Sequence, residues 1–380
     1  MQLRIKLVPL AIALAFAGAA SAQTVIKIGH VAPLSGTSAH LGKDNENGAK
    51  MAVEELNAKG FMLNGKKVTL QLLLEDDAAD PKQGPAVAQK LVDAKVNGVI
   101  GHLNSGTTVP ASRVYHDAGI PQISPSATTP QYTKQGFKSA FRVVANDNKL
   151  GGTLGRYAVE KLGAKRIAVI DDRSAYGQGV ADQFIKGAKG KSKAVQIVGK
   201  EFTNPNATDF TAILTSIKGK KPDLIFFGGM DSVAGPMLKQ MKALGIDAKF
   251  MGGDGICTPK LALLAGDAIG ENRVTCAEAG GVKGAQEKVM ADFVSRYKAK
   301  YKADVQIYAP YVYDAVMVMA KAMQTANSAE PTKYLPVLQK IKHQGVTGMI
   351  QFDNFGDIKD GSLTLYTYKG GAKTKMEVVQ

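Results

Sequence analysis

The stretch GHLNSGTTVPASRVYHDAGIPQISPSATT, residues 101–129, contains two places where an apolar run gives way to hydroxyl residues. The run at 99–101 reads as the end of a buried strand, and the NSGTT that begins at Asn104, with Pro110 expected in the first helical turn, predicts a helix start. Residues 120–124 predict a second short strand, which ends in PSATT. Backbone N–H groups and hydroxyl oxygens at such strand ends can bind an anion. Two interpretations stay open: a small carboxylate held by Ser105, Thr128 and nearby amides, or two ordinary helix caps.

Strand-like and helix-like runs alternate along most of the chain without hairpin turns, which favours parallel sheets covered by helices on both faces. A first series occupies residues 25–103 and a second occupies residues 141–252, and their similar size predicts two α/β units. The expected strands are 25–31, 68–74, 99–103, 167–171, 195–198, 224–227 and 250–252, and the expected helices are 42–58, 81–95, 152–162, 179–188, 209–217 and 232–244.

The last hundred residues have a different pattern. Helical runs are expected at 286–300, 310–325 and 334–341, with only two strand-like pieces, 347–352 and 363–368. So little sheet does not make a third domain easily. We therefore expect these elements to complete the two α/β units, so that the chain crosses between the units more than once.

The N-terminus predicts export. Arg4 and Lys6 precede an apolar run at 7–17, and the small residues that end in Ala22 follow, a pattern typical of a secretory signal cleaved after Ala22. The run is too short for a stable membrane anchor, and no lipidation cysteine follows it. The sequence thus predicts a free periplasmic protein.

Only the net charge favours nucleic acid as a partner, and the other observations argue against it. Lys and Arg number 48 against 33 Asp and Glu, a formal net charge of +15. The densest basic cluster, KGAKGKSK at 186–193, has no interleaved aromatic residues, and an exported protein rarely meets nucleic acid.

Signatures of catalysis and metal binding are missing from the sequence. It has no G-x-S-x-G, H-E-x-x-H, P-loop or dinucleotide fingerprint, and no His or Cys pair has the spacing of metal ligands, so neither a cofactor nor a metal is expected. The acid pairs at 76–77 and 171–172 each end a strand, where Asp usually serves a turn. The two cysteines, Cys257 and Cys276, follow strand-like runs. They are either bridged or two buried thiols.

The strand ends of the second unit suggest a partner for the hydroxyls of the first. They carry Tyr176, Met230 and Asp254, and ligands of open α/β sheets bind at this carboxyl edge. If the two units face each other, a ligand carboxylate would meet Ser105 and Thr128, while an ammonium group would meet Asp254. The alternative for Asp254 is an ordinary turn residue between glycines.

Several motifs together resemble the branched-chain amino-acid-binding proteins of ABC importers. The similarity runs in order along the whole mature chain, and its motifs are GHVAPLSG (29–36), EDDAADPKQ (75–83), GHLNSGTTVPAS (101–112), ISPSAT (123–128), DDRSAYGQG (171–179), FFGGM (226–230), MGGDG (251–255) and IYAPYVYDA (307–315). The resemblance implies a type I periplasmic binding fold, in which two doubly wound parallel-sheet lobes are joined by three hinge segments. The implied division is 23–144 plus 279–350 for one lobe and 145–278 plus 351–380 for the other.

The resemblance also implies a function. It is that of a monomeric receptor, not an enzyme, which captures an aliphatic, branched-chain amino acid between its lobes and delivers it to an ABC permease at the inner membrane. Two alternatives are the same fold binding an amide, urea or aromatic acid, and an exported α/β enzyme.

Site residues follow from the same resemblance, position by position. Ser105 and Thr128 match the carboxylate ligands, with the backbone of Ser126 also in contact, and Asp254 matches the acidic partner of the ammonium group. Tyr176 resembles the aromatic residue that covers the ligand, and Tyr308 an aromatic wall of the side-chain pocket. The chain departs from the Leu/Ile/Val receptor at three places: Met230 replaces a Tyr, Leu41 replaces an aromatic wall, and Ala79 and Asn104 occupy its disulfide positions.

Overall fold

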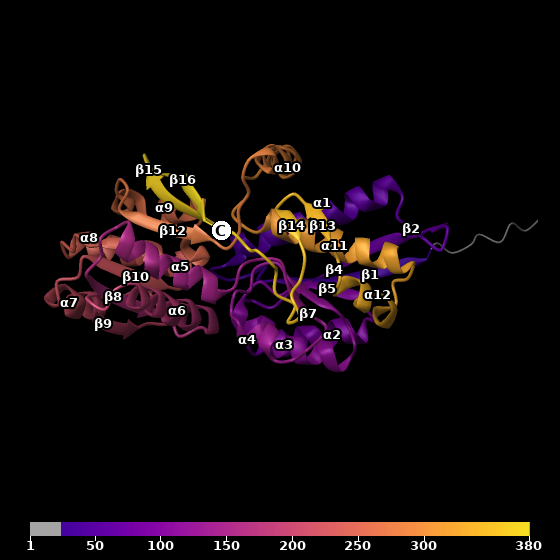
Figure 1. Ribbon diagram of the computed structural model, residues 1–380, viewed down its shortest axis with the longest axis horizontal. Coiled ribbons are helices and arrows are strands. Elements are labelled where there is room, and N and C mark those ends of the chain that lie inside the picture. The colour runs from indigo at the N-terminus through magenta and orange to yellow at the C-terminus, as the bar shows by residue number, and fades with distance from the viewer. Residues whose placement is uncertain (1–23, 380) are drawn as a thin grey trace, which may run out of the picture.

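Two sheets form the centres of two lobes that lie side by side along the long axis of the molecule (Figure 1). The computed structural model describes residues 24–379. The first sheet is wholly parallel and has the order β4-β1-β5-β6-β7. Its strands are β1 Val25–Ala32, β4 Thr69–Asp76, β5 Gly98–Gly101, β6 Gln122–Ser124 and β7 Ala140–Arg142. We call the part of the molecule built on this sheet the first lobe.

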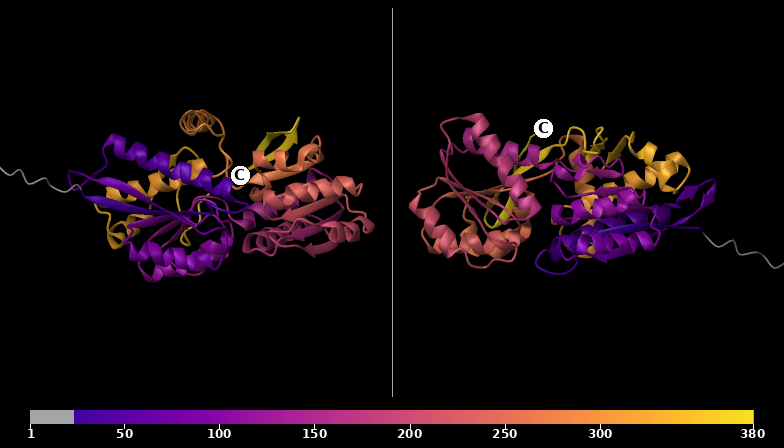
Figure 2. Two further views of the ribbon diagram at one scale, coloured as in Figure 1. Left: turned by 180° about the vertical axis from the view of Figure 1, so that it is seen from behind. Right: turned by 90° about the horizontal axis from the view of Figure 1, so that it is seen from below.

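The second sheet has the order β16-β15-β12-β11-β10-β8-β9, and the part built on it is the second lobe. Its five parallel strands are β8 Arg166–Asp171, β9 Gln196–Phe202, β10 Leu224–Gly228, β11 Lys249–Gly252 and β12 Val274–Glu278. Two antiparallel strands, β15 Leu363–Lys369 and β16 Ala372–Val379, extend the edge next to β12. The views from behind and from below show these C-terminal strands beside the second lobe, close to the junction of the lobes (Figure 2).

Hairpins occur at three places, one of them inside the first series of strands and helices, where no hairpin was expected. They are β15 with β16, β2 Met62–Leu63 with β3 Lys66–Lys67, and β13 His343–Gly345 with β14 Gly348–Ile350. The turn between β2 and β3 is Asn64-Gly65, and both residues have positive φ, 52° and 69°. Such a turn matches the twist of a two-residue hairpin. Polar lysine-rich strands concealed this hairpin from a search for apolar runs.

Helices cover the faces of both sheets, as the alternating pattern predicted. In the first lobe α1 packs against α11, and α2 packs against α3. In the second lobe α5 packs against α6, and α8 packs against α9. The helices are α1 Ala39–Lys59, α2 Gln83–Asp93, α3 Ser105–Asp117, α4 Gln131–Lys134, α5 Asp147–Glu160, α6 Ala175–Lys191, α7 Thr211–Gly219, α8 Asp231–Ala243, α9 Pro259–Ala265, α10 Ala285–Tyr301, α11 Ala309–Ala326 and α12 Pro331–Leu338, with two short 3-10 helices, η1 Asp254–Ile256 and η2 Gly266–Ile269.

Two local expectations about helix starts need correction. Pro110 is the sixth residue of α3 and not part of its first turn. Asn104 is the residue before the helix, and its side chain makes no capping hydrogen bond. The start of α6 lies at Ala175, four residues before the expected position 179, because the Ser174 hydroxyl accepts a hydrogen bond from Gly177 N and caps the helix there.

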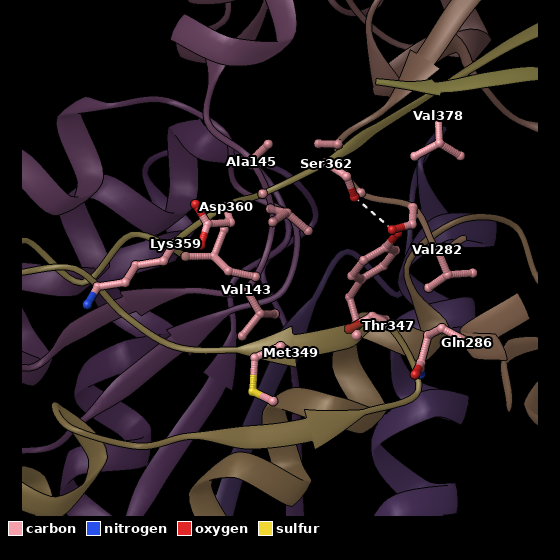
Figure 3. A pocket seen from close by; sticks show the side chains of 18 of the residues that line it. Val143, Ala145, Val282, Gln286, Thr347, Met349, Lys359, Asp360, Ser362 and Val378 are labelled. Carbon is pink, nitrogen blue, oxygen red and sulfur yellow. Dashed lines mark hydrogen bonds between the residues drawn. The ribbon is translucent and has the colours of Figure 1, made fainter. Parts of the chain in front are cut away.

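The chain passes between the lobes three times, after β7, after β12 and before β15. The three crossing segments line one cavity of about 340 Å³, and Val143, Val282 and Ser362 represent them in Figure 3. Ser362 Oγ donates to Gly281 O at 2.7 Å and so ties two of the segments together. Arg142 N donates to Gly356 O at 2.9 Å, which attaches the start of the third segment to the first lobe.

The predicted signal sequence and its cleavage after Ala22 lie outside the described residues. Within residues 24–379, none of the helices has the length and apolar character needed to span a bilayer.

Candidate functional site

The cleft between the lobes brings together six of the eight side chains proposed as ligand contacts. An inner cavity of about 20 Å³ opens toward an outer one of about 610 Å³, and Asn104, Ser105, Tyr176 and Met230 line both. Residues of the first lobe and of the second face each other across this space. The proposed residues that line the inner cavity are Ser105, Ser126, Tyr176, Met230, Asp254 and Tyr308.

Hydroxyl groups and a helix start form one side of the inner cavity. Ser105 is the first residue of α3, and its Oγ accepts a hydrogen bond from Thr129 N at 3.3 Å, which leaves its own O–H free to donate. Ser126 Oγ donates to Leu103 O at 3.0 Å and so fixes the second strand end beside the first. The first N–H groups of a helix have no partner within the helix, so this side offers donors to an anion.

Thr128 and Leu41 are placed differently from the other six. Thr128 is buried, its O accepts from Asp147 N at 2.8 Å, and its Oγ1 has no hydrogen-bond partner among residues 24–379. Thr128 is absent from the lining of both cavities. Leu41 is fully buried in the hydrophobic core shared by α1 and the first sheet, and it too is absent from the lining of both cavities.

A buried carboxylate forms the opposite side of the inner cavity. Asp254 begins η1, directly after β11, and its Oδ2 accepts a hydrogen bond from the Tyr308 hydroxyl at 2.9 Å. Its Oδ1 finds no partner within the described residues. Burial raises the pKa of Asp254 to about 6, against the opposing effect of the Tyr176 and Tyr308 hydroxyls. An ionised carboxylate with an unused acceptor in a dry site is suited to a cation.

Asp147, at the start of α5, is a second buried acid that sequence reasoning missed. Its side chain is fully buried, and neither carboxylate oxygen has a hydrogen-bond partner that meets geometric criteria within residues 24–379. Burial raises the pKa of Asp147 to about 7; the Thr128 hydroxyl opposes the shift and the charge of Asp254 adds to it. In sequence, Asp147 follows Asn146 at a helix start, where acids commonly favour the helix dipole, so nothing singled it out.

Asp44 of α1 fixes the position of Tyr308. Its Oδ2 accepts hydrogen bonds from the backbone N–H groups of three consecutive residues, Ile307, Tyr308 and Ala309, at 2.8–3.1 Å. These groups precede or begin α11, so a carboxylate from one helix caps the start of another. Sequence reasoning missed this contact, because Asp44 lies within the expected helix 42–58 and its partners are more than 260 positions away.

The acid pairs serve turns, as predicted. Asp76 Oδ1 accepts from Leu34 N and Ala78 N, both at 2.8 Å. Asp172 Oδ1 accepts from Ser174 N at 3.0 Å. Asp77 Oδ2 also pairs with Nδ1 of the buried His102 at 2.8 Å.

Of the two alternatives for the cysteines, a disulfide bridge and two buried thiols, the structure shows the bridge. Cys257 and Cys276 form a disulfide with their Cα atoms 5.4 Å apart. It joins the residue after η1 to β12 and so ties the segment that carries Asp254 to the sheet. Within residues 24–379 no group of three or more His, Cys, Asp or Glu side chains is arranged to hold a metal ion.

The cavity at the crossing segments is a poorer candidate for a ligand-binding site than the cleft. Its polar groups are already paired, since Gln286 Nε2 donates to Gly345 O at 2.7 Å and to Val346 O at 3.0 Å. The lining shown in Figure 3 has no buried polar side-chain atom without a partner. In the cleft, by contrast, such atoms of Asn104 and Asp254 belong to the lining itself.

Comparisons with known proteins show which proteins this chain resembles. Residues 25–372 match the family model described as periplasmic binding protein. The chain is 36% identical over 381 residues to the Leu/Ile/Val-binding protein homolog 1 of Brucella abortus, covering 98% of both chains. It is 35% identical over 369 residues to the leucine-, isoleucine-, valine-, threonine- and alanine-binding protein of Pseudomonas aeruginosa, covering 96% of both.

A solved structure confirms the fold class. The branched-chain amino acid transporter substrate binding protein LivJ of Streptococcus pneumoniae, in complex with isoleucine, superposes with a TM-score of 0.83 at 29% identity. The alignment covers 94% of this chain and 99% of that one. The expectation of two doubly wound lobes joined by three crossing segments is thereby confirmed.

Proposed function

This chain belongs to the periplasmic binding protein family, and we propose that it is the extracytoplasmic receptor of an ABC transporter for an aliphatic, branched-chain amino acid. The Pseudomonas aeruginosa relative is named for binding leucine, isoleucine, valine, threonine and alanine, and the Brucella abortus relative is named as a homolog of a Leu/Ile/Val-binding protein. The family is one of substrate-binding receptors, not of enzymes.

One observation carries the proposal: the free acceptor of Asp254 lies across a single cavity from the hydroxyl of Ser105. An α-amino acid is a zwitterion, and its two charges need opposite partners a short distance apart. The ammonium group would bind Asp254 Oδ1, and the carboxylate would accept hydrogen bonds from Ser105 Oγ and the first N–H groups of α3. Thr128 would support this headgroup from behind.

The side chain of the ligand would occupy the apolar part of the same lining. Leu103, Met230 and the rings of Tyr176 and Tyr308 provide it. Met has a flexible, polarisable side chain that adapts to differently branched groups. This composition favours an aliphatic side chain over a charged one.

Lobe closure is the mechanism that the geometry supports. Asp254 belongs to the second lobe and Ser105 to the first, so a ligand meets both charges only when the lobes are together. Binding energy gained only in the closed form shifts an open population toward the closed one. We assign residues 143–146, 279–284 and 358–362 as the hinge. The third hinge segment lies after the lobe boundary that was predicted between residues 350 and 351. The reason is that Gly356 O accepts a hydrogen bond from Arg142 of β7, which keeps Gly356 with the first lobe.

Titration calorimetry with matched ligands tests the headgroup site. Leucine, isoleucine and valine are expected to bind, whereas 4-methylpentanoate, which lacks the ammonium group, and leucinamide, which lacks the carboxylate, are expected to bind at least about a hundredfold more weakly. Benzoate and acetamide probe the alternative ligands of this fold. Tight binding of benzoate, or equal binding of leucine and 4-methylpentanoate, would overturn the proposal.

Export and delivery are tested separately. Osmotic-shock fractionation should recover the protein from the periplasm, and its N-terminus should be Gln23 if the signal is cleaved after Ala22. Delivery predicts that leucine uptake by cells is lost when the protein is deleted and restored when it is supplied again.

A further inference from the structure

One side-chain pair joins the two lobes beside the cleft without lining it. His40, the second residue of α1 in the first lobe, places Nε2 2.8 Å from Oδ2 of Asp231, the first residue of α8 in the second lobe. The His40 side chain is 14% exposed and that of Asp231 1% exposed. Neither residue lines either cavity of the cleft, although their neighbours Ser38, Met230 and Ser232 do.

The chemistry of the His40–Asp231 pair fixes which atom donates the hydrogen bond. An ionised carboxylate only accepts hydrogen bonds, so the imidazole Nε2 donates. The Thr258 hydroxyl donates to the same Oδ2 at 2.6 Å from within the second lobe. When the lobes separate, Asp231 therefore keeps Thr258 and gains water, while His40 becomes exposed. The contact can therefore break and reform without leaving a buried charge unpaired.

The pair acts on the same equilibrium as the ligand. A contact made only in the closed form raises the closed fraction, and apparent affinity rises with the fraction of the binding-competent state. None of the three crossing segments contributes a residue to the His40–Asp231 contact. The contact therefore does not set the path along which the hinge moves.

We propose that His40 and Asp231 form a latch that holds the lobes closed and slows the escape of the bound amino acid without touching it. The inference rests on the proposed function, because it assumes that closure captures a ligand. His40 is a positioning residue in this scheme, since it acts on the ligand only through the position of the second lobe.

The test compares His40→Ala, His40→Gln and the matched control His116→Ala. His116 pairs with Ser139 Oγ at 3.3 Å inside the first lobe, so its loss breaks a histidine contact that does not cross the cleft. Stopped-flow dissociation of leucine should be about 5- to 30-fold faster in His40→Ala. His40→Gln keeps a side-chain N–H donor and should recover most of the loss, and His116→Ala should dissociate at the wild-type rate.

A second variant links the effect to the partner. In Asp231→Ala, adding His40→Ala should produce no further change in the leucine dissociation rate. A merely structural role of His40 would lower the melting temperature of the ligand-free protein while leaving that rate unchanged, and this result would overturn the latch.

Failure of the latch and failure of the proposed function give different results. If the wild-type protein does not bind leucine, the function fails, and the latch is judged from small-angle scattering of the ligand-free protein. A larger radius of gyration in His40→Ala than in wild type and His116→Ala supports the latch, and an unchanged radius overturns it.

Discussion

Tyr308 and Asp254 belong to different lobes, yet the Tyr308 hydroxyl donates a hydrogen bond to Asp254 Oδ2 at 2.9 Å. The bond turns Asp254 so that Oδ1 is left as the free acceptor. Asp44 holds the backbone of Tyr308 in turn, at 2.8 Å. A line of polar contacts therefore runs from α1 of the first lobe to the proposed ammonium site in the second.

Removal of that hydroxyl should weaken ligand binding. In Tyr308→Phe we expect leucine affinity to fall about 5- to 15-fold, because a hydrogen bond to a buried charge that forms on closure is lost. Calorimetry measures the change. The control Tyr334→Phe removes a hydroxyl that donates to Asn97 O at 2.7 Å, near the amino end of β5, and should bind like wild type. Equal affinities of Tyr308→Phe and wild type would speak against the proposed role of this bond.

Replacing Asp254 or Ser105 should lower leucine affinity more than replacing an equivalent residue outside the cavity. Asp254→Asn is expected to lower leucine affinity about 10- to 100-fold, and Ser105→Ala about 5- to 10-fold. Ser112→Ala is the matched control, because Ser112 is also on α3 but its Oγ donates to Val109 O at 2.7 Å, away from the cavity. Changes below about threefold at both Ser105 and Asp254 would place the headgroup elsewhere.

Leucine affinity should depend on the ionisation of Asp254. Since its pKa is about 6 in the folded protein, the carboxylate that the ammonium needs is present above that pH and is lost below it. Affinity should therefore fall about tenfold per pH unit as the pH drops from 6 toward 4. Calorimetry at several pH values measures this slope, and Asp254→Asn should flatten it. A wild-type profile without any slope between pH 4 and 6 would contradict the assignment.

The buried acid Asp147 should make the ligand-free protein less stable at high pH. Burial raises its pKa from 3.8 to about 7, so the folded protein holds the proton more tightly than the unfolded chain. This favours folding below about pH 4, and the benefit is lost as the pH rises through 7. Asp147→Asn cannot ionise. It should raise the free energy of unfolding by roughly 1–3 kcal/mol at pH 8 and change it little at pH 4, where Asp147 is protonated in the folded chain and partly protonated in the unfolded chain.

Denaturant unfolding of the ligand-free variant at both pH values measures the effect of Asp147. Asp182→Asn, at an exposed acid on α6, provides the control and should behave like wild type at both. If Asp147→Asn and wild type were equally stable at pH 8, ionisation of Asp147 would not lower the free energy of unfolding, and the prediction would be wrong.

The disulfide should stabilise the second lobe. Cys257 and Cys276 are 19 residues apart in sequence, and closing a loop of this length contributes about 3 kcal/mol in the chain-entropy model. Replacing both cysteines with serine should lower the melting temperature and weaken leucine binding, because Asp254 lies three residues before the bridge. Scanning calorimetry with and without a reductant checks the effect, and reductant should leave the double variant unaffected.

Local pattern was sufficient for most of the architecture. The period of apolar residues gave most strands of both sheets, although not the edge strand β16, and motifs at their carboxyl ends gave Ser105, Tyr176 and Asp254. It was insufficient where polar sequence forms a strand, as at Lys66–Lys67, and where a residue has an ordinary local role and a second one across the fold, as with Asp44 and Asp147.

The sequence by itself predicted an export signal, and it determined most of the order of strands and helices along the chain and the residue types available at each strand end, because these depend on neighbours within a few positions. Only the tertiary structure decided that Leu41 is part of the core, that Thr128 is buried outside the cavity lining, and that His40 reaches Asp231. Those outcomes depend on how three crossing segments set one lobe against the other. Periodicity shows which face a side chain occupies, but the neighbour on that face can be 191 positions away, as for His40, or 265 positions away, as for Asp44.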